Sequence, residues 1–140
     1  MAGGRIVGPA IRLSGEEVIV FAAEDRRLYG VSTEAVQRFR VSLPGRPVAI
    51  TQVTESTVAV LLFPGQLLLF NNAGEEVWRR DLAGGTAMDV GVAAGNRILV
   101  LSSDRLQALS LGGSLLWELP TGGQWSALVP ISPGQPPSPL

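Results

Sequence analysis

Residues 58–63 read Val-Ala-Val-Leu-Leu-Phe and residues 67–70 read Leu-Leu-Leu-Phe, with only Pro64-Gly65-Gln66 between them. Short runs of aliphatic, β-branched and aromatic residues between Pro and Gly are typical of β-strands. The first run is apolar at every position, whereas a strand with one face in water would alternate. We therefore expect a strand covered on both faces, followed by a tight antiparallel return.

Two further segments complete a unit of four strands around this pair. The four strands are predicted at residues 47–53, 57–63, 66–71 and 76–82. The turns between them are short and rich in Gly, Pro, Asn and Ser, which indicates an antiparallel meander.

The same unit occurs three times along the chain. The first apolar runs start at Val18, Val58 and Ile98, and the second runs start at Leu28, Leu67 and Leu106, so both sets recur at a regular spacing. A large aromatic residue follows each second run, at Phe39, Trp78 and Trp117. A period of about 40 residues with four strands per unit is that of a β-propeller blade. We predict an all-β fold of three four-stranded antiparallel blades, with the tryptophans buried in equivalent places; a duplicated β-sandwich or barrel is the alternative.

The repeats divide the chain into segments. We predict an N-terminal segment at 1–7, blades at 8–45, 46–85 and 86–123, an extra first-type strand at 124–132 that could serve as a clasp, and a flexible Pro-rich tail at 133–140.

Residues 106–117, Leu-Gln-Ala-Leu-Ser-Leu-Gly-Gly-Ser-Leu-Leu-Trp, and residues 67–78 resemble the repeat of quinoprotein-type (PQQ-like, WD40-like) β-propellers. Gly74 and Gly113 lie four residues before their tryptophans, as in that family. The third unit also resembles an NHL-type propeller repeat. The resemblance implies the fold and not dehydrogenase activity, because enzymatic members need a full ring, a calcium site and a quinone pocket closed by adjacent cysteines.

The amino-acid composition excludes several kinds of catalytic and metal-binding site. The chain has 140 residues with no cysteine, no histidine and no lysine, 11 arginines and a net charge of −1. Disulfides, thiolate metal sites, P-loops and Schiff-base chemistry are thereby excluded, and the commonest metal ligand and general base are missing. We expect no enzyme, no cofactor and no metal site.

Partners and location follow from the same composition. The balanced charge, without aromatic residues among the basic ones, disfavours nucleic acid. No apolar run approaches the roughly 20 residues of a membrane-spanning helix, and the N-terminus does not read as a leader. We therefore expect no membrane contact and a cytoplasmic location.

Charged residues recur in two places. Asp25-Arg26-Arg27 and Ser103-Asp104-Arg105 occupy the same hairpin of the first and third units, where Asp suits the turn. Their arginines would share one rim of the ring and could bind a small anion or a protein. A second, basic set lies on the predicted outermost strands, where charge protects an edge from sheet-to-sheet aggregation. It consists of Arg38, Arg40, Arg79 and Arg80, and is interrupted by Glu118 in the third unit.

Three blades leave two apolar faces open, whereas closed propellers have about four to eight blades. We expect a homodimer of three plus three blades, in which the first blade of one chain packs on the third blade of the other. We place Val18, Val20, Leu28 and Val31 on one open face, Ile98, Val100, Leu106 and Trp117 on the other, and Trp125, Leu128 and Ile131 at or near the seam.

These expectations predict a non-enzymatic β-propeller interaction scaffold that binds partners on its loop rims. Two alternatives stay open: a fragment of a larger propeller protein, and a small-ligand binding protein that uses the central channel. The channel would be lined by Val48, Ile50, Met88, Val90 and Val92 or their neighbours.

Overall fold

The computed structural model describes residues 5–14, 17–82, 85–93 and 97–120, which form twelve strands and no helix. The first sheet contains β1 (Ile6–Leu13), β2 (Val18–Ala23), β3 (Arg27–Ser32) and β4 (Gln37–Ser42). The second contains β5 (Arg46–Thr54), β6 (Thr57–Phe63), β7 (Gln66–Asn71) and β8 (Glu76–Asp81). The third contains β9 (Ala87–Ala93), β10 (Arg97–Ser102), β11 (Arg105–Leu109) and β12 (Leu115–Pro120).

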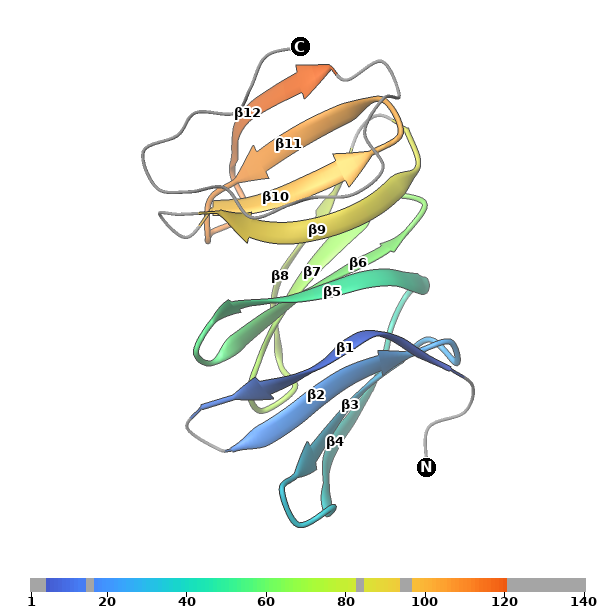
Figure 1. The fold of residues 1–140 in the computed structure, drawn as a ribbon, viewed down its shortest axis with the longest axis vertical. Helices are drawn as coiled ribbons and strands as arrows, with labels where there is room; N and C mark the ends of the chain where they lie inside the picture. The colour runs from blue at the N-terminus through green and yellow to red at the C-terminus, as the bar shows by residue number, and fades with distance from the viewer. Residues whose placement is uncertain (1–4, 15–16, 83–84, 94–96, 121–140) are drawn as a thin grey trace.

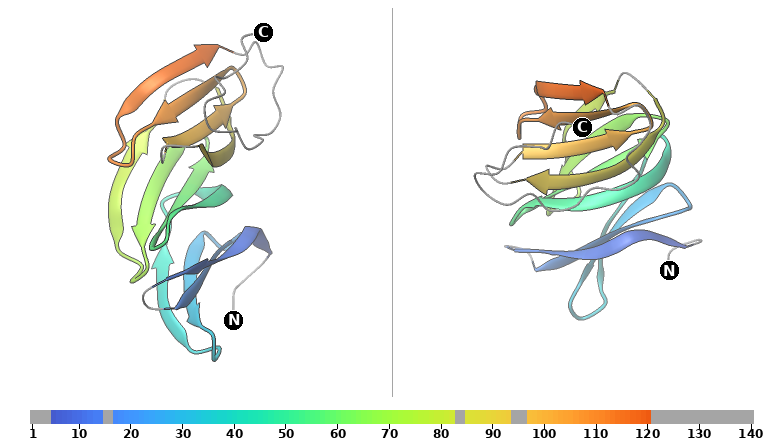
Figure 2. Two further views of the ribbon diagram at one scale, coloured as in Figure 1. Left: turned by 60° about the vertical axis from the view of Figure 1, so that its left-hand side comes forward. Right: turned by 45° about the horizontal axis from the view of Figure 1, so that its top comes forward.

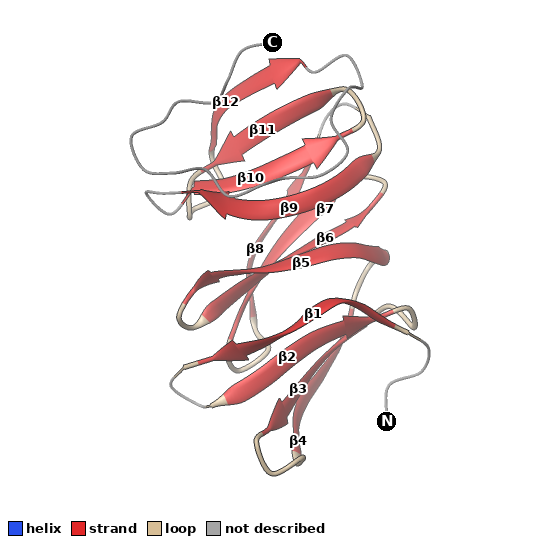
Figure 3. Cartoon of the chain, in the orientation of Figure 1, coloured by secondary structure: helices blue, strands red, loops and turns tan. Residues whose placement is uncertain are grey.

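Each sheet is an antiparallel meander in which every strand pairs with its neighbours in sequence (Figures 1 and 3). The prediction of three four-stranded meanders is therefore confirmed. In the second sheet, the observed bounds differ by at most one residue from the predicted ones, because Gly, Pro and Asn mark the turns locally. None of the described residues forms a helix that would be long and apolar enough to cross a membrane.

The three sheets stack face to face along an arc (Figure 2). Their first strands approach one another most closely, β1 against β5 and β5 against β9. The fourth strands, β4, β8 and β12, lie along the opposite, convex side of the arc. Neighbouring sheets are thus closer together at their first strands than at their fourth strands, as blades arranged around a ring are.

Two apolar cores fill the spaces between the sheets. The first joins β1, β2 and β3 to the second sheet and contains Leu13, Val18, Val20, Leu28, Ile50, Val58, Val60, Leu68 and Phe70. The second joins the second sheet to the third and contains Ala59, Leu61, Leu67, Leu69, Val90, Ile98, Val100 and Leu109. Strand β6 contributes alternate side chains to both cores, which explains why it is apolar at every position from Val58 to Leu62.

This arrangement corrects the side chains that were expected on the open faces. Val18, Val20 and Leu28 are 0% exposed in the core between the first and second sheets, so they do not reach a partner chain. Ile98 and Val100 likewise lie between the second and third sheets. The physical reason is that successive side chains of a strand point to opposite faces of its sheet. An alignment that is wrong by one position therefore assigns a side chain to the other face.

The residues at equivalent positions of the three sheets are Val20, Ala59 and Leu99. Val20 faces the second sheet and Ala59 faces the third sheet. Leu99 points the same way from the third sheet, toward its outer face. The step from Val20 to Ala59 is one position shorter than the step from Val18 to Val58. The alignment of Val18 with Val58 therefore joined side chains on opposite faces of their sheets.

Candidate interaction surfaces

An aromatic side chain of each of the first two sheets lies against a glycine turn of the following sheet. The ring of Phe39 occupies the space beside Gly74, where an added Cβ atom would lie 2.5 Å from the ring. The indole of Trp78 lies in the same way over Gly113, where an added Cβ atom would lie 3.1 Å away. Both glycines have positive φ, 81° and 88°, which favours glycine at these turns.

The turn between the third and fourth strands is built identically in the three sheets. The amide of the fourth residue donates to the carbonyl of the first: Ala35 to Ser32, Gly74 to Asn71 and Gly113 to Ser110, at 2.9, 3.1 and 3.0 Å. The first sheet has Ala35 at the glycine position, with φ of 66°. Each sheet therefore presents the same turn toward the side on which a preceding sheet packs.

Trp117 stands at the position of Phe39 and Trp78 in the third sheet. It packs on a cluster formed by Leu99, Leu101, Leu106 and Ala108, with Met88 and Ala93 beside it. All these residues belong to the third sheet, on the face that looks away from the second. Trp78 and Trp117 thus have equivalent orientations, as predicted, although both are half-buried rather than largely buried.

The first sheet has its own outer face at the other end of the stack. Because alternate residues of β2 and β3 point into the core, the outward ones are Ile19, Phe21, Tyr29 and Val31. The rings of Phe21 and Tyr29 stack at 5.2 Å with 14° between their planes, and the Tyr29 hydroxyl donates to the Asp25 carboxylate. Ile19, Phe21 and Val31 are half-buried, so this end of the stack exposes apolar surface.

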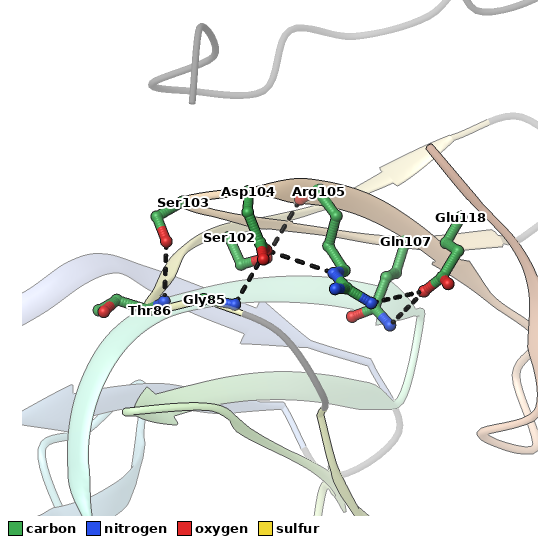
Figure 4. Close-up of polar contacts among 8 residues, drawn as sticks. All are labelled: Gly85, Thr86, Ser102, Ser103, Asp104, Arg105, Gln107 and Glu118. Atoms are coloured by element: carbon green, nitrogen blue, oxygen red, sulfur yellow. Dashed lines mark hydrogen bonds and ion pairs between the residues drawn. The ribbon is translucent and has the colours of Figure 1, made fainter. Parts of the chain in front are cut away.

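Figure 4 shows a polar cluster on the rim of the third sheet, at the hairpin between β10 and β11. Asp104 Oδ1 accepts hydrogen bonds from the Gly85 amide at 2.9 Å and from Arg105 Nε at 3.2 Å. These contacts, the Gly85 amide first and Arg105 next, lower the pKa of Asp104. Arg105 also contacts Glu118 Oε1 at 3.2 Å.

The sequence left open that the arginines of the polar hairpins bind a small anion or a protein, and the geometry does not favour an anion. Arg105 lies between the carboxylates of Asp104 and Glu118, and Arg27 lies 3.8 Å from Asp25. In the third sheet, the contact of Asp104 with Gly85 also holds the start of β9 against the β10–β11 hairpin. We therefore interpret the cluster as structural.

Two of the four arginines in the basic set on the fourth strands also have partners within the chain. Arg79 contacts Glu76 at 2.6 Å, and this hydrogen bond lowers the pKa of Glu76. Arg80 donates to the Gly113 carbonyl of the third sheet at 2.9 Å. Arg38 and Arg40 are exposed.

A pocket of about 250 Å³ lies between the second and third sheets at the same rim. It is lined by Pro64, Gly65, Leu82, Gly85 and Thr86, none of which carries a charge. Within the described ranges, no group of three or more carboxylates, histidines or cysteines could hold a metal ion.

The residues expected to line a central channel mostly pack between sheets instead. Ile50 is 5% exposed in the first core and Val90 is 6% exposed in the second, where Val92 packs as well. Met88 packs on the outer face of the third sheet, and Val48 is half-buried. The faces of β5 and β9 therefore serve sheet packing, because the first strands bring neighbouring sheets closest together.

Three of the expected seam residues, Trp125, Leu128 and Ile131, lie outside the described residues, as do the segments 124–132 and 133–140. Sequence reasoning placed Val31, Leu106 and Trp117 on outer faces, where the structure has them. It missed Ile19, Phe21, Leu99 and Leu101. An alignment of Val20 with Ala59 and Leu99 would have found them.

Solved structures with this arrangement establish the fold. The structure of BBS1N in complex with ARL6DN is similar with a TM-score of 0.69 and 17% identity, over 80% of this chain and 38% of that one. BamB from Moraxella catarrhalis is similar with a TM-score of 0.65 and 18% identity, over 82% of this chain and 38% of that one. The three sheets are β-propeller blades.

No protein-family model and no curated protein matches the chain. The resemblance to quinoprotein-type or NHL-type repeats therefore remains a prediction. The chain spans 38% of the length of both similar propeller structures.

Proposed function

We propose that this chain is a non-enzymatic scaffold that acts by association through the outer faces of its terminal blades. The observation that carries the proposal is the outer face of the first sheet. Ile19, Phe21 and Val31 are half-buried there, whereas residues on the corresponding face of the second sheet, Val58, Val60 and Phe70, are at most 1% exposed. The outer face of the first sheet is thus apolar, like the face of the second sheet that packs on a preceding blade. No preceding blade covers it among the described residues.

We propose a second copy of the chain as the partner. Trp117 has the orientation of Trp78, which packs on the turn at residues 110–113 of the next sheet. The Ser32–Ala35 turn of a second copy has the same backbone hydrogen bond as that turn, so Trp117 could pack on it in the same way. Packing the third sheet of one chain on the first sheet of the other, twice, gives a closed ring of six blades, within the usual range of about four to eight. Burial of the half-exposed outer face of the first sheet, at Ile19, Phe21 and Val31, would drive this association.

A larger propeller is the second candidate, and the 38% coverage of both similar structures favours it. In that case the blades next to Phe21 and Trp117 would come from the same longer chain. One of the similar structures is a complex with ARL6DN, which is consistent with a binding role for a propeller of this kind. The cytoplasmic location expected from the sequence also remains a proposal, and cell fractionation tests it.

Light scattering of the purified chain over a wide concentration range tests the dimer. We expect twice the chain mass of 14.7 kDa for the wild type and the mass of one chain for Phe21→Asp, because a buried unpaired carboxylate is strongly unfavourable. The matched control is Val77→Asp on β8 of the second sheet, where the side chain is 53% exposed. It should leave the dimer intact. A wild-type chain that is monomeric throughout the range contradicts the dimer.

A further inference from the structure

The three turns before the fourth strands share more than their backbone hydrogen bond. In each, a side-chain oxygen of the first residue accepts from the amide that follows the turn: Ser32 Oγ from Val36 at 3.1 Å, Asn71 Oδ1 from Glu75 at 3.0 Å and Ser110 Oγ from Ser114 at 3.2 Å. The fourth residue has positive φ in all three turns, 66°, 81° and 88°. A Cβ atom at this residue therefore points the same way in each sheet, toward the side on which a preceding sheet packs.

In the second and third sheets, an aromatic ring of the preceding sheet occupies the space where this Cβ atom would be. A Cβ atom added to Gly74 would lie 2.5 Å from the Phe39 ring, and one added to Gly113 would lie 3.1 Å from the Trp78 ring. Both distances are shorter than the roughly 3.5 Å at which two carbon atoms pack. Glycine at the turn is therefore what lets the preceding blade approach so closely. We call such a contact between a ring and the turn of the next sheet a seam.

The turn of the first sheet has Ala35 at the glycine position, and this residue is exposed. Its methyl group occupies the space that the equivalent glycines leave to a ring. If a tryptophan approaches this turn as Trp78 approaches Gly113, the methyl group and the indole compete for the same space. A seam at the first sheet therefore cannot close as tightly as the two seams within the chain.

The other half of such a seam is Trp117, which has the orientation of Trp78. The Trp78 indole N–H donates to the carbonyl of Leu111, the second residue of its turn, at 2.7 Å. Within the described part of the chain, the Trp117 indole N–H has no hydrogen-bond acceptor. Thr33 is the second residue of the turn in the first sheet, so its carbonyl is the equivalent acceptor.

We infer that Ala35 determines how tightly a second copy is held. The Trp117 indole of one copy packs on the first turn of the other and donates to the Thr33 carbonyl, and the Ala35 methyl group keeps it from the closest approach. This inference rests on the dimer proposed above and adds that the seams between copies are weaker than the seams within a chain. The ring of two copies should therefore open at these seams and exchange subunits, while each chain keeps its three sheets together.

Sedimentation equilibrium of the full chain tests this inference through the dissociation constant of the dimer. Ala35→Gly should lower the constant at least about tenfold, because a ring of two copies has two identical seams and each loses an overpacked contact. Ala35→Asn should raise it, since Asn tolerates positive φ but is larger than Ala. The matched control is Gly74→Ala, which places the same methyl group in a seam within one chain. It should lower the free energy of unfolding and leave the dissociation constant unchanged.

A second substitution shows whether Ala35 acts through Trp117. Trp117→Leu removes the ring and keeps an apolar side chain, so in this background Ala35→Gly should change the dissociation constant by less than about twofold. If Trp117→Leu abolishes the dimer, Ala35→Gly should not restore it. The inference is wrong if Ala35→Gly leaves the wild-type constant unchanged, if it acts equally with and without the ring, or if it restores a dimer that Trp117→Leu has lost.

The same measurements separate a failure of the dimer from a failure of the role of Ala35. A wild-type chain that is monomeric at every concentration contradicts the proposed dimer. If Ala35→Gly then forms a dimer, the Ala35 methyl group is what keeps two copies apart, and the inference stands. If Ala35→Gly is monomeric as well, both the dimer and the inference are wrong.

Discussion

The indole nitrogen of Trp78, in the second sheet, donates a hydrogen bond of 2.7 Å to the carbonyl oxygen of Leu111, in the third sheet. The same ring lies over Gly113, two residues further along that turn. One side chain therefore contacts the next blade at two points of the same turn. Phe39 occupies the equivalent place in the first sheet but has no donor, so its contact with Gly74 rests on the ring alone.

Substitutions of Trp78 should separate the hydrogen bond from the ring contact. Trp78→Phe removes the donor and keeps most of the ring, so we expect a loss of about 1 kcal/mol in the free energy of unfolding. Trp78→Ala also removes the buried ring and should cost roughly 3 kcal/mol, since the side chain is half-buried. Urea unfolding measures both. Equal losses for the two variants would show that the hydrogen bond, and not the ring, holds the sheets together.

Exchanging glycine and alanine in the turns before the fourth strands should change stability in opposite directions in the first and second sheets. Gly74→Ala should destabilise the chain by more than about 1 kcal/mol, because φ is positive and the new methyl group meets the Phe39 ring. Ala35→Gly in the first sheet should instead stabilise it, by up to about 1 kcal/mol, because φ at Ala35 is also positive. Thermal and urea unfolding of the two variants test the pair. A loss of stability in Ala35→Gly would contradict this account of the turn.

Asp104 should contribute stability that depends on pH. Its pKa is lower in the folded chain than in the unfolded chain, chiefly because of the Gly85 amide and then Arg105. The contribution is therefore complete above the unfolded pKa of about 3.9 and is lost as the pH falls through the lower folded value.

Asp104→Asn removes this charge and keeps an oxygen that can accept from Gly85. The difference in the free energy of unfolding between the wild type and Asp104→Asn should be constant near neutral pH and shrink below a pH of about 4. Urea titrations at several pH values measure it. A difference that persists unchanged to the most acidic conditions would show that the Asp104 carboxylate has no special role.

Core and edge leucines should behave differently. Leu68 is 0% exposed between the first and second sheets, so Leu68→Ala should cost about 2–5 kcal/mol. Leu116 on β12 is 48% exposed, and Leu116→Ala should change stability by no more than about 0.5 kcal/mol. A large loss in Leu116→Ala, measured by urea unfolding at concentrations where the chain is a monomer, would mean that this edge is covered.

Much of the fold could be predicted because its signals are local. The strand bounds follow from short apolar runs between Gly, Pro and Asn, and the repeat follows from the spacing of Leu28, Leu67 and Leu106. The tryptophan positions follow in the same way, since Trp78 and Trp117 keep both the spacing and the orientation. The candidate surfaces were predicted as outer faces of the terminal blades, but most of their residues were not.

The sequence by itself determined the twelve strands of the described residues, their antiparallel order and the need to cover both faces of β6, because composition and turn chemistry act within a few residues. The tertiary structure alone decided which face each side chain takes. Val18 and Ile19 are both apolar, so the sequence pattern does not distinguish the one that packs on the second sheet from the one that faces outward. That choice depends on the register of β2 against β1 and β3 and on the fit of Phe39 to Gly74, contacts that join residues far apart in the chain.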